Sequence, residues 1–252
     1  MKLLLLGGTA EGSGLARLLA GQPRFQAILS LAGRTERPAA SPLPQRIGGF
    51  GRVIGLCSYL FENKIDVLVD ATHPYAAQMS RNAAMASRRL GVPLLALRRP
   101  PWQAQAGDRW QTVADAAAAA EALGTAPRRV FLAMGRLEVA AFAAAPQHDY
   151  LLRSVDYPGP LPLPQLRIVT ARGPFAEADE EQLLREERIE VIVSKNSGGT
   201  ATYGKIAAAR RLSLPVILLQ RPVLPEVESV ATPAAAIQWL DARHAADARR
   251  GV

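Results

Sequence analysis

A glycine-rich turn at residues 7–14 (GGTAEGSG) is the first place where residue types and spacing point to chemistry. It follows the apolar run 3–6 directly and precedes a segment with helical periodicity. Glycines in such a turn let the backbone approach a phosphate closely, and the first amides of a helix add free N–H groups and partial positive charge. The spacing differs from G-x-G-x-x-G, but the strand–turn–helix context predicts a phosphate-binding turn. A tight turn without a ligand is the alternative.

Arg34 and Thr35 follow the second predicted strand. In dinucleotide-binding folds an acidic residue about 20 positions beyond the glycines binds the ribose 2′-hydroxyl. Arg34 stands about that far beyond Gly12, and no acid precedes it in that strand. An arginine at this position suits a 2′-phosphate, so the sequence favours NADP over NAD. The alternative is a solvated arginine.

Residues 70–76 (DATHPYA) follow a predicted buried strand, 66–70. The carboxyl ends of strands in an open α/β sheet face the ligand crevice. Thr72 can cap the next helix, and Pro74 can begin it because the N–H that proline lacks has no partner there. Imidazole as a group changes its charge near neutral pH, so His73 is a candidate proton donor, with a structural histidine as the alternative.

A second glycine-containing segment, residues 194–205 (SKNSGGTATYGK), holds two of the four lysines of the chain. Because the other 26 basic residues are arginines, two lysines in one segment indicate that ammonium groups are required there. The segment precedes a predicted helix, whose first amides also suit anionic groups. The sequence therefore predicts an anion-binding loop.

Within that segment Gly199, Gly204 and Lys205 have the spacing of a phosphate-binding P-loop. However, Ile206 stands where the Ser or Thr that binds magnesium belongs, and the glycines begin several residues after the strand. Both departures argue against an NTPase.

Several arginines stand at or near predicted strand ends, where they would ring one cleft if the two halves of the chain face each other. A solvated surface arginine is the alternative for each. These residues are Arg136, Arg153, Arg172 and Arg221.

Composition argues against several other classes of protein. One cysteine and three scattered histidines cannot build a closed zinc site, so we expect no metal. No apolar run approaches the roughly 18 residues of a membrane span. The net charge of +8 fits an anionic partner, but isolated basic residues and 6% aromatic residues argue against nucleic acid. Cys57 cannot form an internal disulfide, so we expect a reducing, cytoplasmic compartment.

Strands and helices alternate along the chain, which predicts an α/β fold with parallel sheets covered by helices on both faces. The predicted strands are 3–6, 25–31, 66–70, 92–97, 130–134, 150–155, 166–170, 189–194 and 216–219. The predicted helices are 9–21, 56–63, 75–90, 114–123, 176–187, one ending near 212, and 233–244.

The segment 99–102 (RPPW) interrupts this alternation and predicts a domain junction at about 99–111. We therefore expect an N-terminal domain of residues 1–98 and a C-terminal domain of residues 112–252. A chain of 252 residues, 49% of them hydrophobic, is long enough for two cores.

Four motifs taken together resemble the precorrin-6A reductase family of cobalamin biosynthesis, and the resemblance runs from residue 1 to about 240. It implies two Rossmann-like domains with the active site in the cleft between them. It also implies NADPH-dependent reduction of a double bond in the precorrin-6A macrocycle, which gives precorrin-6B. Other enzymes of the pathway are conceivable partners. The motifs are 7–12 (GGTAEG), 70–76 (DATHPYA), 99–102 (RPPW) and 194–199 (SKNSGG).

The resemblance and the motifs together assign a role to each candidate residue. A macrocycle with several carboxylates suits a site lined by Arg and Lys. The pyrophosphate side of NADPH goes to Gly7, Gly8, Thr9, Glu11 and Gly12, the 2′-phosphate to Arg34 and Thr35, and the nicotinamide side to Ala71, Thr72 and Pro74, with His73 as the candidate acid. The carboxylates of the substrate go to Arg136, Arg172, Lys195, Asn196, Ser197, Gly198 and Gly199.

Other classes of protein stay open at this stage. Another NADP-dependent oxidoreductase of a polyanionic small molecule is one, although a short-chain oxidoreductase needs a Tyr-x-x-x-Lys pair that this chain lacks. The other is a non-catalytic module that binds NADPH as a sensor. Such a module would show no turnover with any tetrapyrrole.

Overall fold

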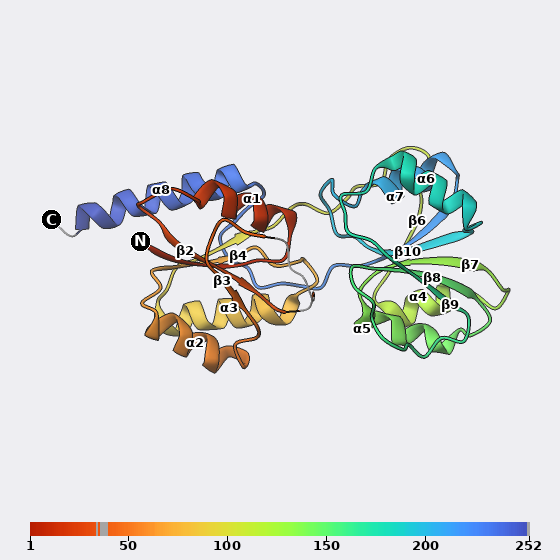
Figure 1. Cartoon of the computed structure of the whole chain (residues 1–252), viewed down its shortest axis with the longest axis horizontal. Coiled ribbons are helices and arrows are strands. Elements are labelled where there is room, and N and C mark those ends of the chain that lie inside the picture. Colours follow the sequence, from red (N-terminus) through yellow and green to blue (C-terminus); the bar gives the residue numbers. More distant parts are fainter. Residues whose placement is uncertain (34, 36–39, 251–252) are drawn as a thin grey trace. The chain divides into compact units, whose positions relative to one another are not determined.

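The computed structural model describes residues 1–33, 35 and 40–250, and it divides into two compact units (Figure 1). The first unit comprises Met1–Pro100 and Pro222–Val252, and the second comprises Pro101–Arg221. Each unit contains one six-stranded sheet in which all strand pairs are parallel. The predicted α/β fold of two parallel-sheet domains is confirmed.

The sheet of the first unit has the strand order β12-β5-β4-β1-β2-β3. Helices α1 and α8 pack together on one face and α2 and α3 on the other (Figure 1). The strands are β1 (Lys2–Leu6), β2 (Gln26–Leu31), β3 (Gln45–Ile47), β4 (Val67–Asp70), β5 (Leu94–Leu97) and β12 (Ser229–Val230), and the helices are α1 (Ala10–Leu19), α2 (Arg52–Glu62), α3 (Ala77–Leu90) and α8 (Pro233–Arg250).

The sheet of the second unit has the order β6-β11-β10-β7-β8-β9. Helices α6 and α7 pack together, and α4 packs beside the short 3-10 helix η1 (Ala140–Ala144). The strands are β6 (Arg109–Val113), β7 (Arg129–Ala133), β8 (Asp149–Ser154), β9 (Leu166–Thr170), β10 (Val191–Lys195) and β11 (Pro215–Leu219), and the helices are α4 (Ala116–Ala122), α5 (Arg136–Val139), α6 (Glu177–Glu186) and α7 (Gly204–Arg211).

The two sheets have the same topology when each is numbered from its central strand. In the first, β1, β2 and β3 run outward to one edge and β4 and β5 to the other. In the second, β7, β8 and β9 run to one edge and β10 and β11 to the other. The chain reverses its direction of winding between β1 and β4, and again between β7 and β10. Ligands of open α/β sheets bind at the carboxyl ends of the strands at such a switch point.

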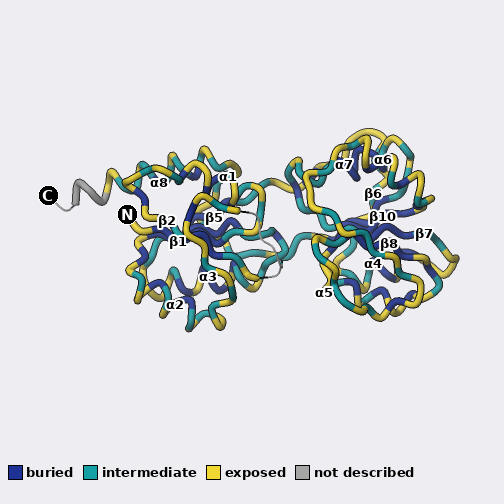
Figure 2. Tube along the Cα trace, viewed as in Figure 1, coloured by how far each residue is buried: buried dark blue, intermediate teal, exposed yellow. Residues whose placement is uncertain are grey.

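The apolar first strand shows why the sequence folds in this way. Leu3 and Leu5 are fully buried in the core beneath α1 and α8, whereas Leu4 and Leu6 face the core beneath α2 and α3. A strand that is apolar on both faces needs helices on both sides, as parallel sheets have. Figure 2 shows the central strands of both units as their most buried parts.

The structure differs from the predicted domain boundaries at the C-terminus and at the junction. Residues 222–252, predicted to lie in the second domain, return to the first unit, where β12 pairs with β5 and α8 packs on α1. The predicted junction ends within β6, which pairs with β11 in the second sheet. The first unit thus takes its sixth strand, β12, from a segment outside its main run of chain, and no local sequence pattern reports that pairing. Among the described residues no helix combines the length and the apolar character that a membrane span requires.

Candidate functional site

The glycine turn lies where the sequence predicts it, between β1 and α1 at the switch point of the first sheet. Gly8 has a φ of +124°, a conformation that side-chain-bearing residues rarely adopt. A Cβ on Gly12 would lie 3.2 Å from the Cβ of Ala71, so the first turn of α1 packs closely against the end of β4. The turn therefore brings the N-terminus of a ten-residue helix to the carboxyl edge of the sheet.

Thr9 is the N-cap of α1, and its side chain connects the turn to the neighbouring strand. Its Oγ1 accepts a hydrogen bond from the Gly12 N–H (3.0 Å) and donates one to the carbonyl of Ala71 (2.8 Å). Because the hydroxyl has these two partners, we expect Thr9 to offer a phosphate its backbone amide. The Thr9 side chain therefore holds the turn after β1 against the loop after β4.

Glu11, predicted to lie on the pyrophosphate side, forms an ion pair with Arg99. The guanidinium of Arg99 donates to Glu11 Oε2 at 2.6 Å, and both side chains are largely buried. Arg99 follows β5, the strand next to β4, so three strand ends meet at this edge. The arginine offsets the negative charge of Glu11 beside a helix N-terminus that would otherwise suit an anion less well.

Asp70, the last residue of β4, holds the loop that follows it. The carboxylate is 3% exposed and accepts hydrogen bonds from the backbone N–H of Thr72 (3.1 Å), from the hydroxyl of Thr72 (2.6 Å) and from the hydroxyl of Ser80 on α3 (2.6 Å). These bonds fix Thr72 at the end of the strand.

His73 and Pro74 lie in this loop, before the helix. The N-cap of α3 is Ala76, so the predicted helix start at Tyr75 and the capping role of Thr72 are wrong. Thr72 bonds to Asp70 because that carboxylate lies two residues back, whereas the free amides of α3 lie further along. The Nδ1 atom of His73 accepts a hydrogen bond from the Tyr75 N–H (3.3 Å). The ring is half-buried at the carboxyl edge of the sheet.

The predicted 2′-phosphate residues follow β2. Thr35 is half-buried there. Arg34 lies outside the described residues, so its role stays a prediction from the sequence.

Lys195 ends β10 at the switch point of the second sheet. Its Nζ donates to Glu138 Oε1 at 2.5 Å. Glu138 lies on α5, the short helix that follows β7 and begins at Arg136. An ammonium has three N–H groups, so Lys195 can also donate to a ligand. The structure thus brings Lys195 and the α5 segment of Arg136 to adjacent strand ends.

The loop after Lys195 is held by contacts from distant parts of the same unit. Both amide atoms of Asn196 bond to the backbone of Trp102, and the Ser197 N–H donates to the carbonyl of Lys195 (2.8 Å). Gly198 and Gly199 have φ values of +68° and +70°. The side chain of Asn196 therefore has a structural task that the sequence did not predict.

Two other predicted arginines differ in their surroundings. Arg153 is buried on β8, and its guanidinium forms two hydrogen bonds with the carboxylate of Glu180 on α6. The guanidinium carbon lies 3.7 Å from the ring centroid of Phe175. Arg153 therefore belongs to the interior and not to a solvent-facing ring of arginines. Arg172 follows β9, two strands away from β7, and is less central to the switch point than Lys195.

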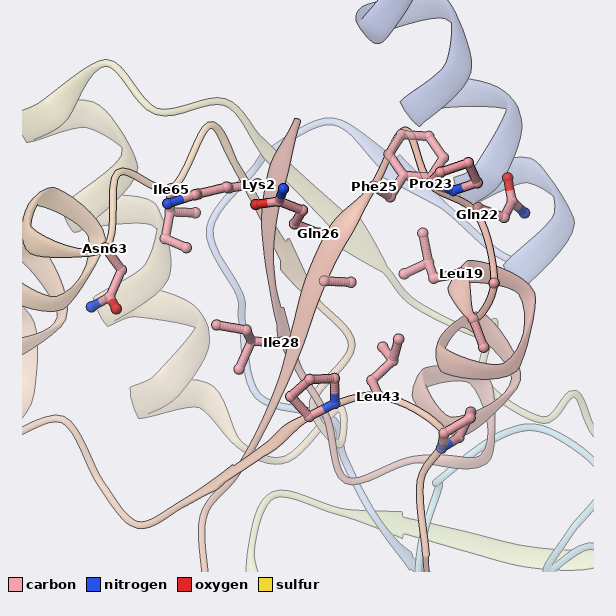
Figure 3. A pocket seen from close by; sticks show the side chains of 15 residues that line it. Lys2, Leu19, Gln22, Pro23, Phe25, Gln26, Ile28, Leu43, Asn63 and Ile65 are labelled. Carbon is pink, nitrogen blue, oxygen red and sulfur yellow. The ribbon is translucent and has the colours of Figure 1, made fainter.

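A pocket of about 690 Å³ lies elsewhere in the first unit (Figure 3). Its lining comes from the amino ends of β1 and β2 and from the segments before β3 and β4, including Lys2, Gln26, Leu43 and Ile65. The glycine turn lies at the carboxyl ends of the same strands. This pocket is therefore not the predicted nucleotide site.

The two switch points offer different chemistry. In the first unit, glycines, backbone amides and a helix N-terminus fit the pyrophosphate of a dinucleotide. In the second unit, Lys195 and nearby arginines offer formal positive charge to carboxylates. Among the described residues no three His, Cys, Asp or Glu side chains are grouped to hold a metal ion.

The sequence analysis gave no role to four residues that the structure brings to these sites. Arg99, Trp102 and Glu138 pair with predicted residues that are distant in the sequence, and side-chain pairing of this kind has no local signal. Asp70 was visible as an acid at a strand end, and Trp102 as part of the 99–102 motif. The four are Asp70, Arg99, Trp102 and Glu138.

Comparison with known proteins finds one matching family model, described as precorrin-6x reductase CbiJ/CobK, over residues 2–241. A protein of Rhodobacter capsulatus named precorrin-6A reductase is 54% identical, with 98% of each chain covered. A protein of the same name from Rhodococcus erythropolis is 47% identical over 95% of this chain and 97% of that protein. A cobalt-precorrin-6A reductase of Priestia megaterium is 27% identical over 87% and 90%.

A solved structure titled CobK precorrin-6A reductase superimposes on this chain with a TM-score of 0.93. Its sequence is 54% identical, and the match covers 97% of each chain.

Proposed function

The chain belongs to the precorrin-6x reductase family, and from that premise we propose that it reduces precorrin-6A to precorrin-6B with NADPH in cobalamin biosynthesis. The observation that carries this proposal is 54% identity to a precorrin-6A reductase over 98% of both chains. Membership of a reductase family implies a nicotinamide cofactor. We further propose that this cofactor is NADPH and that the residues named below form the site.

The first unit is proposed to bind the cofactor. The backbone of Gly7, Gly8 and Thr9 and the amides at the start of α1 would hold the pyrophosphate, with Glu11 neutralised by Arg99. Arg34 and Thr35 would take the 2′-phosphate. The loop of Ala71, Thr72 and Pro74, fixed by Asp70, would form the nicotinamide side. When bound, the cofactor supplies the hydride, and the protein supplies position and electrostatics.

The second unit is proposed to bind the substrate. Its acetate and propionate carboxylates would meet Lys195, Arg136 and Arg172, with the backbone of the loop 196–199 beside them. Lys195 is held by Glu138, which fixes the direction of its ammonium group. A site with several cations favours a polycarboxylate over a neutral ring.

The metal-free macrocycle is the proposed substrate. The relatives named precorrin-6A reductase are 45–54% identical to this chain, whereas those named cobalt-precorrin-6A reductase are 26–27% identical. The cytoplasm is the proposed compartment, since Cys57 is a free thiol.

His73 is the proposed acid that donates a proton to the reduced macrocycle. It lies on the loop that follows β4, next to Thr72 and Pro74, and its ring is half-buried. An imidazole can hold and release a proton near neutral pH. The variant His73→Asn should lower turnover and flatten its dependence on pH. An unchanged turnover number and pH profile would retire this role.

The test of the function is anaerobic incubation of the protein with precorrin-6A and NADPH. We expect the absorbance of reduced nicotinamide to fall in step with formation of precorrin-6B. A parallel reaction with cobalt-precorrin-6A tests the choice of macrocycle. Cofactor binding without turnover of either macrocycle would favour the sensor alternative.

A further inference from the structure

The loop between β10 and α7 contains glycines whose conformations are costly to fix. Two consecutive glycines, Gly198 and Gly199, have left-handed conformations, with φ values of +68° and +70°. Such residues are the most mobile in an unfolded or loosely held chain, so fixing them costs more entropy than fixing other residues. The loop must therefore be held by contacts from outside it.

Trp102 supplies one set of these contacts. Its backbone N–H donates to Asn196 Oδ1 at 2.8 Å, and its carbonyl accepts from Asn196 Nδ2 at 3.1 Å, across 94 positions of sequence. Its indole Nε1–H donates to the carbonyl of Gly199 at 2.7 Å. The indole is 8% exposed, and the ammonium of Lys205 lies 4.9 Å from its ring centroid. Trp102 thus binds both ends of the segment 196–199.

Arg221 supplies a second set of contacts. Its Nε donates to the carbonyl of Asn196 at 2.8 Å, and one terminal nitrogen donates to the carbonyl of Ser197 at 2.9 Å. The planar fork of a guanidinium can serve two adjacent carbonyls at once, and the single ammonium of a lysine cannot match that geometry. Trp102 and Arg221 stand at the beginning and the end of the second unit.

We propose that Arg221 and Trp102 are positioning residues for the substrate-binding loop: together they fix Asn196–Gly199 in the conformation that places the loop beside Lys195 for a carboxylate. The inference rests on the proposed function, because it takes this loop as part of the substrate site. It replaces the predicted role of Arg221 as a member of a ring of arginines. It also gives the Asn196 side chain a task other than binding carboxylates.

Preorganisation explains how such residues act. A loop that is already ordered loses less conformational entropy when the ligand binds. If only a fraction of the molecules hold the loop in its binding-competent form, the apparent affinity for the ligand falls in proportion to that fraction. Loosening the loop should therefore raise the KM for the macrocycle. The NADPH site uses residues of the first unit, so its affinity should not change.

The variants Arg221→Lys and Trp102→Phe test the proposal. The first keeps the charge and loses the fork, and the second keeps an aromatic ring and loses the indole N–H. We expect each to raise the KM for precorrin-6A by about fivefold or more, with kcat and the Kd of NADPH within about twofold of the parent. Arg109→Lys is the matched control, because Arg109 donates to a single carbonyl, Ser213, at the amino end of β6.

The double variant sharpens the result. If both residues fix one loop, the change in KM in the double variant should differ from the product of the changes in the two single variants, as expected for residues in one network. An unchanged KM in both single variants would overturn the proposal. So would an equal loss of NADPH affinity, or an equal effect in Arg109→Lys, because either would indicate general destabilisation.

A readout that needs no turnover separates this proposal from the proposed function. Hydrogen exchange of the amides at 198–200 in the ligand-free protein should accelerate in Arg221→Lys and Trp102→Phe, with exchange in β10 unchanged. If the parent protein does not reduce precorrin-6A, the proposed function fails. The hydrogen-exchange result then decides the positioning role: faster exchange in the two variants supports it, and unchanged exchange overturns it.

Discussion

The loops after β4 and β10 occupy equivalent places in two sheets of the same strand order, yet different contacts stabilise them. The loop after β4 is fixed partly by its own strand, since Asp70 binds Thr72 two residues on, and partly by Thr9 of the adjoining turn, which bonds to Ala71. The loop after β10 is fixed from a distance, by Glu138 on Lys195 and by Trp102 on Asn196.

The difference fits what each loop is proposed to bind. A dinucleotide pyrophosphate can be bound by backbone amides and a helix N-terminus, which a short turn supplies by itself. Several carboxylates spread over a large ring need formal charges at separate points, and long side chains must be held there against their own rotamer entropy. Under the proposed assignment, the same topology would serve two chemistries through different loops.

The largest expected effect concerns buried ion pairs. Arg153 and Glu180 in the second unit are 7% and 3% exposed, whereas Arg99 and Glu11 in the first are 12% and 18% exposed. Glu180→Ala leaves Arg153 buried without its partner and should lower the free energy of unfolding by about 3–5 kcal/mol. Glu11→Ala should cost less, because water can reach Arg99. Urea denaturation of both variants measures the difference, and equal losses would contradict it.

The next effect concerns the cation of the second unit. Lys195→Met removes a charged donor of the proposed substrate site and should weaken binding of precorrin-6A by about 10–100-fold, with the Kd of NADPH nearly unchanged. Lys2→Met is the control, because Lys2 stands at the amino end of β1. Steady-state kinetics and cofactor titration give both values. A loss of cofactor affinity in Lys195→Met would move this loop to the other site.

A smaller effect concerns the choice of cofactor by the first unit. If Arg34 meets the 2′-phosphate, the parent should bind NADPH about tenfold more tightly than NADH or better, and Arg34→Leu should abolish most of that preference. Arg17→Leu, on the exposed side of α1, should leave it intact. Titration of both cofactors tests this, and equal affinities in the parent would refute the role of Arg34.

The smallest effect is the response of the second unit to acid. Burial lowers the pKa of His148 below its ordinary value, nearby Arg128 lowers it further, and a hydrogen bond to Gly124 partly opposes them. The unfolded chain therefore binds the proton more readily than the folded chain. The contribution of neutral His148 to the free energy of unfolding is present above about pH 6.5 and decreases as the pH drops below that value. The slope cannot exceed about 1.4 kcal/mol per pH unit for one proton.

Replacement of His148 separates this effect from others. Burial raises the pKa of Tyr150, its neighbour, to about 12, so Tyr150 does not titrate in the same range. His148→Gln should remove the acid dependence of amide exchange in β7 and β8 and leave that of β1 and β4 as it was. The same acid dependence in the variant would show that other groups cause it.

Sequence patterns were most informative where the physics is local. The apolar run 3–6, the glycines of residues 7–14 and the charge of Lys195 reflect burial, backbone freedom and formal charge, which each segment carries by itself. The predicted start of α3 was wrong because Asp70 competes for Thr72. Arg153 was misplaced because its partner, Glu180, lies on another element.

The sequence by itself determined the alternation of strands and helices, the glycine turn between the first strand and the first helix, and the family of the chain. Tertiary structure alone decided that residues 222–252 return to the first unit, that β6 joins the second sheet, and that Trp102 and Arg221 hold the loop 196–199. The physical reason is that strand pairing and side-chain hydrogen bonds depend on distance in space. Residues separated by 94 positions carry no local sign that they will meet.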